Sequence, residues 1–299
     1  FIHNIRPQKI AALGFDPDSV ITRNPKIIYT GLHGYRENGP YGGMPAYDDV
    51  IQGQSGLAGT FIARDGSPSL VPSVIADKST ALLASTSLLA AYIKRLKSGK
   101  GLYVEISMFE GMVANTMLEH HFGSTFIPQI GKEGYPRVLS EDRRPYATLD
   151  GFICMLAYTD KQWEKFWDLT NNPNYKSDNR FSSAAERAKN IDIIYGITRK
   201  LLAQKSTNDW IELLNKAEIP VGIVNKLEDL KNDPHLKNID FFRNYEHPSE
   251  GKLNVPDTGI QINRKSLPIR KHQPKLGEHN SEILKEVGYT VEDIKRILE

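Results

Sequence analysis

A single aspartate, Asp77, stands where a carboxylate could do chemistry. It lies between the apolar run Leu70–Ala76, which is expected to be extended, and a helix that begins with Lys78-Ser79-Thr80. At this position an aspartate accepts amide hydrogen bonds as an N-cap and faces the positive end of the helix dipole. The same place keeps a carboxylate ionised and nucleophilic in a partly dry site. Capping and nucleophilic catalysis are compatible, and the local sequence leaves both open.

A basic pair, Arg143-Arg144, is a second candidate for substrate binding. Two guanidinium groups could hold a substrate carboxylate through paired hydrogen bonds. As solvated surface residues they would need no function, and the sequence does not decide between these interpretations.

The histidines do not predict a metal site. The eight His residues show no zinc-type spacing, and His120 and His121 are adjacent, so their side chains diverge on a helix. No phosphate-binding loop, dinucleotide fingerprint or nucleophile elbow is visible. The glycines between Gly31 and Gly43 are interpreted as loop formers, because their spacing does not match a phosphate cradle.

The elements around Asp77 predict a unit of a parallel sheet. Strands are expected over Lys26–Tyr29 and Leu102–Met108, and an extended segment over Leu70–Ala76. An Ala- and Leu-rich helix is expected over Ser79–Leu96, with basic residues in its last turns and Gly99 beyond as stop signals. Strand, helix and strand in this order build parallel sheets.

The second half of the chain predicts a small α+β domain. A helix over residues 109–121 and a loop-rich passage precede a strand over Phe152–Tyr158. Three helix starts carry capping signatures, at Thr159/Gln162, Ser183/Glu186 and Ser206/Asp209.

The remaining elements include one passage that the sequence predicts to be irregular. Ile219–Val224 is expected to be extended, residues 245–278 to be loop-like because of four prolines, and a last helix to start at Thr290. Trp163 and Trp167, four residues apart on a helix, are expected in the core.

The composition limits the partners and the compartment. Lys and Arg total 38 against 36 for Asp and Glu, a net charge of +2, so nucleic acid is not an expected partner. The single Cys154 lies in an apolar run and is expected to be a buried, inert thiol. No apolar run is long enough to span a bilayer and no leader is visible, so we expect a cytoplasmic protein without a membrane partner.

Motifs distributed over nearly the whole chain resemble those of the class III CoA-transferases, the family of formyl-CoA transferase, carnitine CoA-transferase and α-methylacyl-CoA racemase. In chain order the matching segments are Asn4-Ile5-Arg6-Pro7, Gly34–Tyr41, Pro45–Asp48, Ser55-Gly56-Leu57, Ile75-Ala76-Asp77, Gly99–Ser107, Arg144-Pro145-Tyr146, Asp150-Gly151, Ala217–Gly222, Asp233–Leu236 and Gly277-Glu278-His279. Their order and spacing together make the resemblance specific.

The resemblance implies a catalytic role for Asp77. Members of this family use the matching carboxylate to attack an acyl-CoA thioester, pass through an aspartyl-CoA thioester and return CoA to an acceptor acid. This covalent route conserves the thioester energy. Tyr47 and Asp48 are the other candidate catalytic residues.

The resemblance also implies a site for coenzyme A or acyl-CoA, with no metal. Its contacts fall on Asn4, Ile5, Arg6 and Leu13, and on Met44, Pro45, Ala46 and Tyr47. An arginine that many relatives place near the CoA nucleotide matches Ala12. The tetraglycine loop of formyl-CoA transferase is absent, so oxalate and formyl-CoA are not favoured as substrates.

The alternatives are a racemase or epimerase of acyl-CoA, and an inactive CoA-binding fragment. The racemase branch needs a histidine that matches Tyr47, so transfer to a small carboxylic acid is favoured. The chain opens on Phe1 without Met, and relatives begin with a further CoA-binding segment that is expected to be lacking here. Either the sequence is truncated, or the natural gene is short and its product inactive, and the sequence does not decide between these two.

The resemblance predicts an α/β fold with a Rossmann-like large domain and a smaller α+β domain. Residues 1–120 are assigned to the large CoA-binding domain, 121–235 to a linker and the small domain, and 236–299 to a segment returning to the large domain. A homodimer of two interlocked chains is expected.

Overall fold

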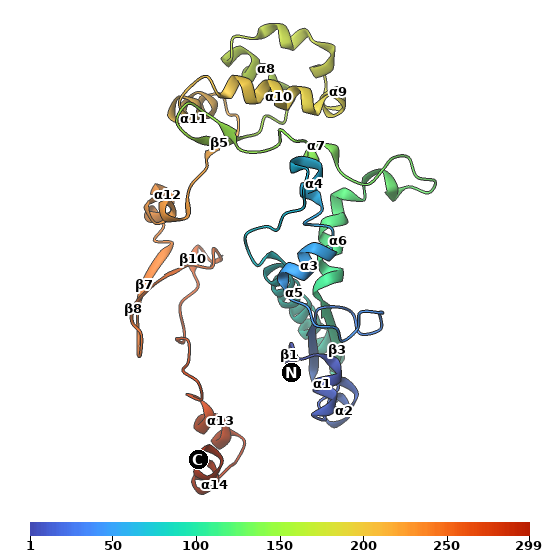
Figure 1. Cartoon of the computed structure of the whole chain (residues 1–299). Coiled ribbons are helices and arrows are strands. Elements are labelled where there is room, and N and C mark those ends of the chain that lie inside the picture. Colours follow the sequence, from blue (N-terminus) through green and yellow to red (C-terminus); the bar gives the residue numbers. More distant parts are fainter. The chain divides into compact units, whose positions relative to one another are not determined.

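The computed structural model describes residues 1–299, and the chain divides into two compact units, residues 1–224 and 225–299. Helices and strands are mixed in both units (Figure 1). None of the helices combines the length and the apolar character that crossing a membrane requires.

The first unit begins with a three-stranded parallel sheet in the order β1-β2-β3. The strands are β1 (Ile2–His3), β2 (Ile28–His33) and β3 (Leu102–Ser107). Residue Ile28 of β2 pairs with Leu102 of β3, and the pairing continues to His33 and Ser107. The strand predicted over residues 26–29 is present but begins later, at Ile28, and continues to His33 in the glycine-rich segment. The strand predicted over residues 102–108 is present and ends one residue earlier, at Ser107.

Helices connect these parallel strands, as parallel pairing requires. Between β1 and β2 lie α1 (Pro7–Ala12) and α2 (Pro17–Arg23). Between β2 and β3 lie α3 (Asp48–Gln54), α4 (Thr60–Asp65) and α5 (Ile75–Ser98), and α6 (Met108–His120) follows β3. Helix α5 packs against β2, β3 and α6 (Figure 1).

The long helix α5 ends where the sequence predicts and begins earlier. Gly99 adopts the left-handed conformation with φ of 70°, which closes the helix, and Arg95 and Lys97 lie in its last turn. The helix starts at Ile75, so the extended segment expected over Leu70–Ala76 is wrong at Ile75 and Ala76. Pro72 has no amide hydrogen to give to a sheet, and the segment before Ile75 forms bends instead.

A small core lies where α3, α5 and α6 meet. Its buried members are Tyr35, Ile51, Ala76 and Met112, each at most 4% exposed. Ala76 is adjacent to Asp77, so this packing fixes the first turn of α5 from inside.

The rest of the first unit surrounds a three-stranded antiparallel sheet in the order β4-β5-β6. It comprises η1 (Phe122–Thr125), α7 (Pro136–Leu139), β4 (Tyr146–Ala147), β5 (Phe152–Met155), α8 (Asp160–Leu169), η2 (Pro173–Ser177), η3 (Asn179–Phe181), α9 (Ala184–Lys189), α10 (Ile191–Leu202), α11 (Thr207–Lys216) and β6 (Val221–Ile223). The three predicted N-caps are confirmed: the side chains of Thr159, Ser183 and Ser206 each accept a hydrogen bond from the amide three residues on. The reciprocal bond that completes a capping box is present at Thr159 alone among the three.

Trp163 and Trp167 lie in the core of this region, as expected, at 5% and 1% exposure. The prediction for Cys154 is wrong, because its side chain is exposed. Successive strand residues point to opposite faces, and Ile153 and Met155 take the buried face of β5.

The second unit contains a β-hairpin that the sequence did not predict. It is formed by β7 (Phe242–His247) and β8 (Gly251–Pro256), paired antiparallel from Phe242/Pro256 to His247/Gly251. Pro248 falls in the turn, and the amide of Asp257 donates to the Phe241 carbonyl, so the nitrogen of Pro256 faces away from β7. Prolines at such positions do not disrupt the ladder, which is why they misled the prediction.

The other elements of the second unit are short. They are η4 (Leu227–Asn232), α12 (Pro234–Asn238), β9 (Gln261–Ile262), β10 (Lys265–Ser266), α13 (Asn280–Glu286) and α14 (Val291–Leu298). Helix α14 begins after Thr290, whose side chain forms a capping box with Asp293, as the sequence predicts.

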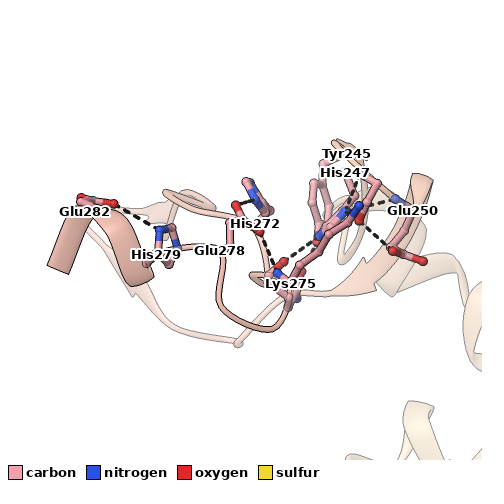
Figure 2. A network of polar contacts seen from close by, with 10 residues as sticks. Tyr245, His247, Glu250, His272, Lys275, Glu278, His279 and Glu282 are labelled. Atoms are coloured by element: carbon pink, nitrogen blue, oxygen red, sulfur yellow. Dashed lines mark hydrogen bonds and ion pairs between the residues drawn. The ribbon is translucent and has the colours of Figure 1, made fainter. Parts of the chain in front are cut away.

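A polar network ties the hairpin to the segment around residues 272–278 (Figure 2). The buried ring of His247 accepts amide hydrogen bonds at Nδ1 from Ser249 and Glu250, and its Nε2 lies 2.9 Å from the Gln273 carbonyl. Nearby, His272 Nε2 lies 2.8 Å from a carboxylate oxygen of Glu278. These bonds satisfy the polar groups at the hairpin turn.

Candidate functional site

A cavity of about 660 Å³ opens where the three parallel strands end. Asn4 and Arg6 follow β1, His33 ends β2, and Met108 follows β3. In open parallel sheets ligands bind in the crevice outside the carboxyl ends of the strands. The lining residues are Asn4, Arg6, Pro7, Leu32, His33, Gly34, Tyr35, Gly43, Met44, Pro45, Ala46, Tyr47, Asp77, Thr80, Ala81 and Met108.

Asp77 lies in this cavity, in the first turn of α5, and is exposed. The helix is 24 residues long, and its N-terminal end favours a negative charge. The predicted N-cap role is wrong, because the helix starts two residues before Asp77 and Val74 occupies the cap. The carboxylate of Asp77 is therefore not needed for capping.

The capping function belongs to Asp48 instead. Its Oδ1 accepts hydrogen bonds from the amides of Ala76, at 2.7 Å, and Asp77, at 3.0 Å. Its Oδ2 accepts a hydrogen bond from Gln52 Nε2 at 2.6 Å. Asp48 is 6% exposed and does not line the cavity, so its contacts indicate that it positions Asp77.

Gln52 extends this support to the segment that precedes α5. Its side-chain oxygen accepts the amide hydrogen of Val71, and its Nε2 donates to the Ser73 carbonyl at 3.1 Å. Gln52 is 1% exposed. Asp48 and Gln52, one turn apart on α3, thus fix the backbone of the segment that leads to Asp77.

The loop between β2 and α3 forms one wall of the cavity. Gln8 of α1 donates to the Gly43 carbonyl at 3.0 Å, which ties the loop to the first helix. Gly34 makes the close approach possible, because a Cβ there would lie 2.4 Å from Ala46 Cβ. Tyr47 is 80% exposed and lines the cavity.

The structure brings together most of the predicted CoA contacts. Asn4, Arg6 and the segment Met44–Tyr47 line the cavity with Asp77, whereas Ile5 and Leu13 do not. Both of these side chains are exposed. Sequence reasoning did not single out Thr80, which lies one turn after Asp77 on the same face of α5 and was recoverable from helical periodicity.

Arg143 and Arg144 lie outside the cavity. Arg144 donates to the Glu141 carbonyl at 2.7 Å and pairs with Asp65 at 3.4 Å. Hydrogen bonds from Arg64, with a smaller effect of the Arg144 charge, hold the pKa of Asp65 below its usual value. These contacts give Arg144 a role in local structure, and binding of a substrate carboxylate by Arg143 and Arg144 stays a prediction.

The sequence matches the description "CoA-transferase family III" over residues 1–280. The chain belongs to this family. The resemblance inferred from the motifs is thereby confirmed.

Curated relatives of this chain are CoA-transferases. It is 25% identical over 289 residues to succinyl-CoA:glutarate CoA-transferase of Homo sapiens, covering 96% of this chain and 66% of that protein. It is 25% identical over 320 residues to formyl-CoA:oxalate CoA-transferase of Rhodopseudomonas palustris, and this match covers 99% of this chain and 75% of that protein. The chain thus spans about two thirds of the length of the human relative.

Solved structures share the fold. A mutant of Rv3272 from Mycobacterium tuberculosis matches with a TM-score of 0.80 at 22% identity, over 94% of this chain and 74% of that one. A CAIB/BAIF family protein from Brucella suis matches with a TM-score of 0.72 at 24% identity, over 96% of this chain and 74% of that one.

Proposed function

We propose that this protein transfers CoA between an acyl-CoA thioester and a carboxylic acid through a thioester on Asp77. The observation that carries the proposal is the position of Asp77, exposed in the cavity shared by Asn4, Arg6 and the segment Met44–Tyr47. Membership in CoA-transferase family III and the activities named for the relatives support it.

The reaction needs only carboxylates and thiolates. The Asp77 carboxylate attacks the thioester carbonyl: a carbon–oxygen bond forms, the carbon–sulfur bond breaks, and the products are an acyl-aspartyl anhydride and free CoA thiolate. The thiolate attacks the Asp77 carbonyl carbon, giving the aspartyl-CoA thioester and the first free acid. The acceptor carboxylate then attacks this thioester, and the released thiolate takes the acceptor acyl group, restoring Asp77. No net proton is gained or lost.

Each part of the site has a task in this scheme. The amides of Ala76 and Asp77 are already bonded to Asp48, so the backbone that carries the nucleophile is held in place before substrate arrives. Arg6 supplies a positive charge at the cavity wall for an anionic part of the substrate. We place Tyr47 at the mouth, where it covers bound substrate.

Partners and assembly follow from the same proposal. The substrates are an acyl-CoA and a small carboxylic acid, and the protein works in the cytoplasm as a homodimer with a Rossmann-like CoA-binding domain. The division into residues 1–120, 121–235 and 236–299 stays part of this proposal. Sedimentation or light scattering measures the assembly.

Trapping the covalent intermediate tests the proposal. The protein is incubated with succinyl-CoA or another acyl-CoA and quenched with hydroxylamine, which converts an aspartyl thioester to a hydroxamate. Trypsin releases residues 65–78, which contain both Asp65 and Asp77, so fragment-ion spectra must locate the modification. We expect it on Asp77, and none in Asp77→Asn.

Asp49→Asn is the matched control, because Asp49 is exposed on the neighbouring helix α3 and does not line the cavity. It should be labelled like the unchanged protein. An Asp77 that stays unmodified across a panel of acyl-CoA donors, in a folded chain that binds CoA, would rule out the covalent scheme.

A further inference from the structure

Three potential metal ligands from different segments converge beside the cavity. His33 Nδ1 lies 3.5 Å from an oxygen of Glu37 and 3.8 Å from an oxygen of Glu105. The three ligand atoms all lie within 4.8 Å of one another. One imidazole and two carboxylates form a ligand set of the kind that binds divalent transition metals.

The sheet register creates this arrangement. Gly31 of β2 pairs with Glu105 of β3, so His33, two residues further along β2, points to the same face as Glu105. The absence of a side chain at Gly31 leaves room for the histidine ring: a Cβ there would lie 2.7 Å from His33 Cε1. Glu37 arrives from the loop that follows the strand.

The His33 ring is buried without a hydrogen-bond partner. Its side chain is 4% exposed, and neither ring nitrogen makes a hydrogen bond. A buried polar group without a partner is costly, and nearly all such groups in folded proteins are satisfied by protein, water or an ion. Nδ1 faces the two carboxylates, so a cation between them would satisfy it.

Two further hydrogen bonds orient the carboxylates of Glu37 and Glu105. The Tyr103 hydroxyl donates to the Glu37 oxygen that faces His33, at 3.1 Å, and the Glu37 amide donates to the corresponding Glu105 oxygen at 2.6 Å. Metal sites use such outer contacts to fix their ligands.

We propose that His33, Glu37 and Glu105 bind one divalent transition-metal ion of the zinc class. Zinc bonds of about 2.0–2.2 Å to nitrogen and oxygen place tetrahedral ligands about 3.4 Å apart. The two histidine–carboxylate distances of 3.5 and 3.8 Å need only a small contraction to meet this value. Three protein ligands leave a fourth position for water or another ligand.

The ion would join two strands and a loop at the cavity wall. His33 belongs to β2, Glu105 to β3 and Glu37 to the loop, and both His33 and the following Gly34 line the cavity. The expected role is structural, because the ion would fix the start of the loop between β2 and α3, which begins at Gly34 and forms one wall of the cavity. This inference does not depend on covalent chemistry at Asp77.

Titration with zinc tests the site in the full chain after treatment with a chelator. We expect one equivalent by calorimetry, and with Co²⁺ the visible absorption bands of a tetrahedral nitrogen and oxygen site. His33→Gln and Glu105→Gln should each weaken binding by at least about 100-fold, and Tyr103→Phe by about 10-fold.

Glu278→Gln is the matched control, because it removes a carboxylate that pairs with a histidine, His272, in the other unit (Figure 2). It should leave the titration unchanged. Circular dichroism establishes that each variant is folded. If His33→Gln does not fold, zinc binding by the Glu37→Gln and Glu105→Gln variants tests the site instead.

Either of two results would overturn the proposal. The first is the absence of zinc binding by the folded, unchanged chain. The second is binding of the same strength and stoichiometry in the folded glutamine variants.

Discussion

Replacing Asp48 by asparagine should disturb Asp77 without touching the cavity. The carboxylate of Asp48 accepts two backbone amides through Oδ1 and the Gln52 amide through Oδ2. An asparagine can keep its oxygen toward the backbone, but its NH₂ group then faces the Gln52 NH₂ group, so two donors meet. Both groups are buried, and neither can turn to water.

The expected loss follows from these contacts. Hydrogen bonds to a charged group contribute about 1.5–3 kcal/mol each, against about 0.5–1.5 kcal/mol for neutral pairs. Two weakened backbone bonds therefore reduce the free energy of unfolding by about 2 kcal/mol. For a unit of the size of residues 1–224, the midpoint of thermal unfolding should fall by about 4–8 °C.

Two measurements check this effect. Thermal unfolding followed by far-UV circular dichroism gives the change in stability, and amide hydrogen exchange at Ala76 and Asp77 should accelerate by up to about 30-fold, the equivalent of 2 kcal/mol. At a temperature where the variant is folded, hydroxamate formation on Asp77 should also slow.

Asp49→Asn is the control, because this exposed residue neighbours Asp48 on the same helix turn. Its stability should stay within about 0.5 kcal/mol of the unchanged protein. If Asp48→Asn behaved like this control in stability and in amide exchange, the assignment of Asp48 as the external cap of α5 would be refuted.

Two further predictions concern the cavity wall and the dependence of stability on pH. Gly34→Ala should lower the free energy of unfolding by about 1–3 kcal/mol in urea denaturation, because its Cβ would overlap Ala46. Gly53→Ala, with open space around the new Cβ on α3, should be neutral or slightly stabilising, and equal losses in both variants would contradict the packing argument. Hydrogen bonds from the amide and hydroxyl of Thr207 hold the pKa of Asp150 below its usual value, so this carboxylate stabilises the fold above the unfolded pKa, about 3.9. The stability difference between the unchanged protein and Asp150→Asn should therefore shrink as the pH falls from about 5 to 3, and a constant difference in thermal midpoint would exclude this contribution.

Local sequence signals predicted the elements that depend on neighbouring residues. The stop of α5 at Gly99, the caps at Thr159, Ser183 and Ser206, and the start of α14 need only a side chain and an amide a few residues apart. The pairing of two parallel strands around an Ala- and Leu-rich helix was likewise visible from composition and spacing.

Signals with two physical meanings misled the prediction. Prolines in residues 245–278 suggested irregular structure, yet Pro248 and Pro256 occupy positions where a hairpin needs no amide hydrogen. Cys154 lies in an apolar run, but the alternation of a strand places it outside. In both cases the position within the sheet decided the outcome.

The residue type and the motifs around Asp77 identified it as the candidate nucleophile, because a carboxylate near a helix start and the family pattern are both properties of the linear chain. Only the tertiary structure decided what surrounds it. Asp48 and Ala76 are 28 residues apart in sequence, and His33 and Glu105 are 72 apart, so no local pattern links them. Packing of α3 on α5 brings Asp48 within 2.7 Å of the Ala76 amide, and the register of β2 on β3 brings His33 within 3.8 Å of Glu105. These tertiary contacts determine the support of Asp77 and the proposed metal site.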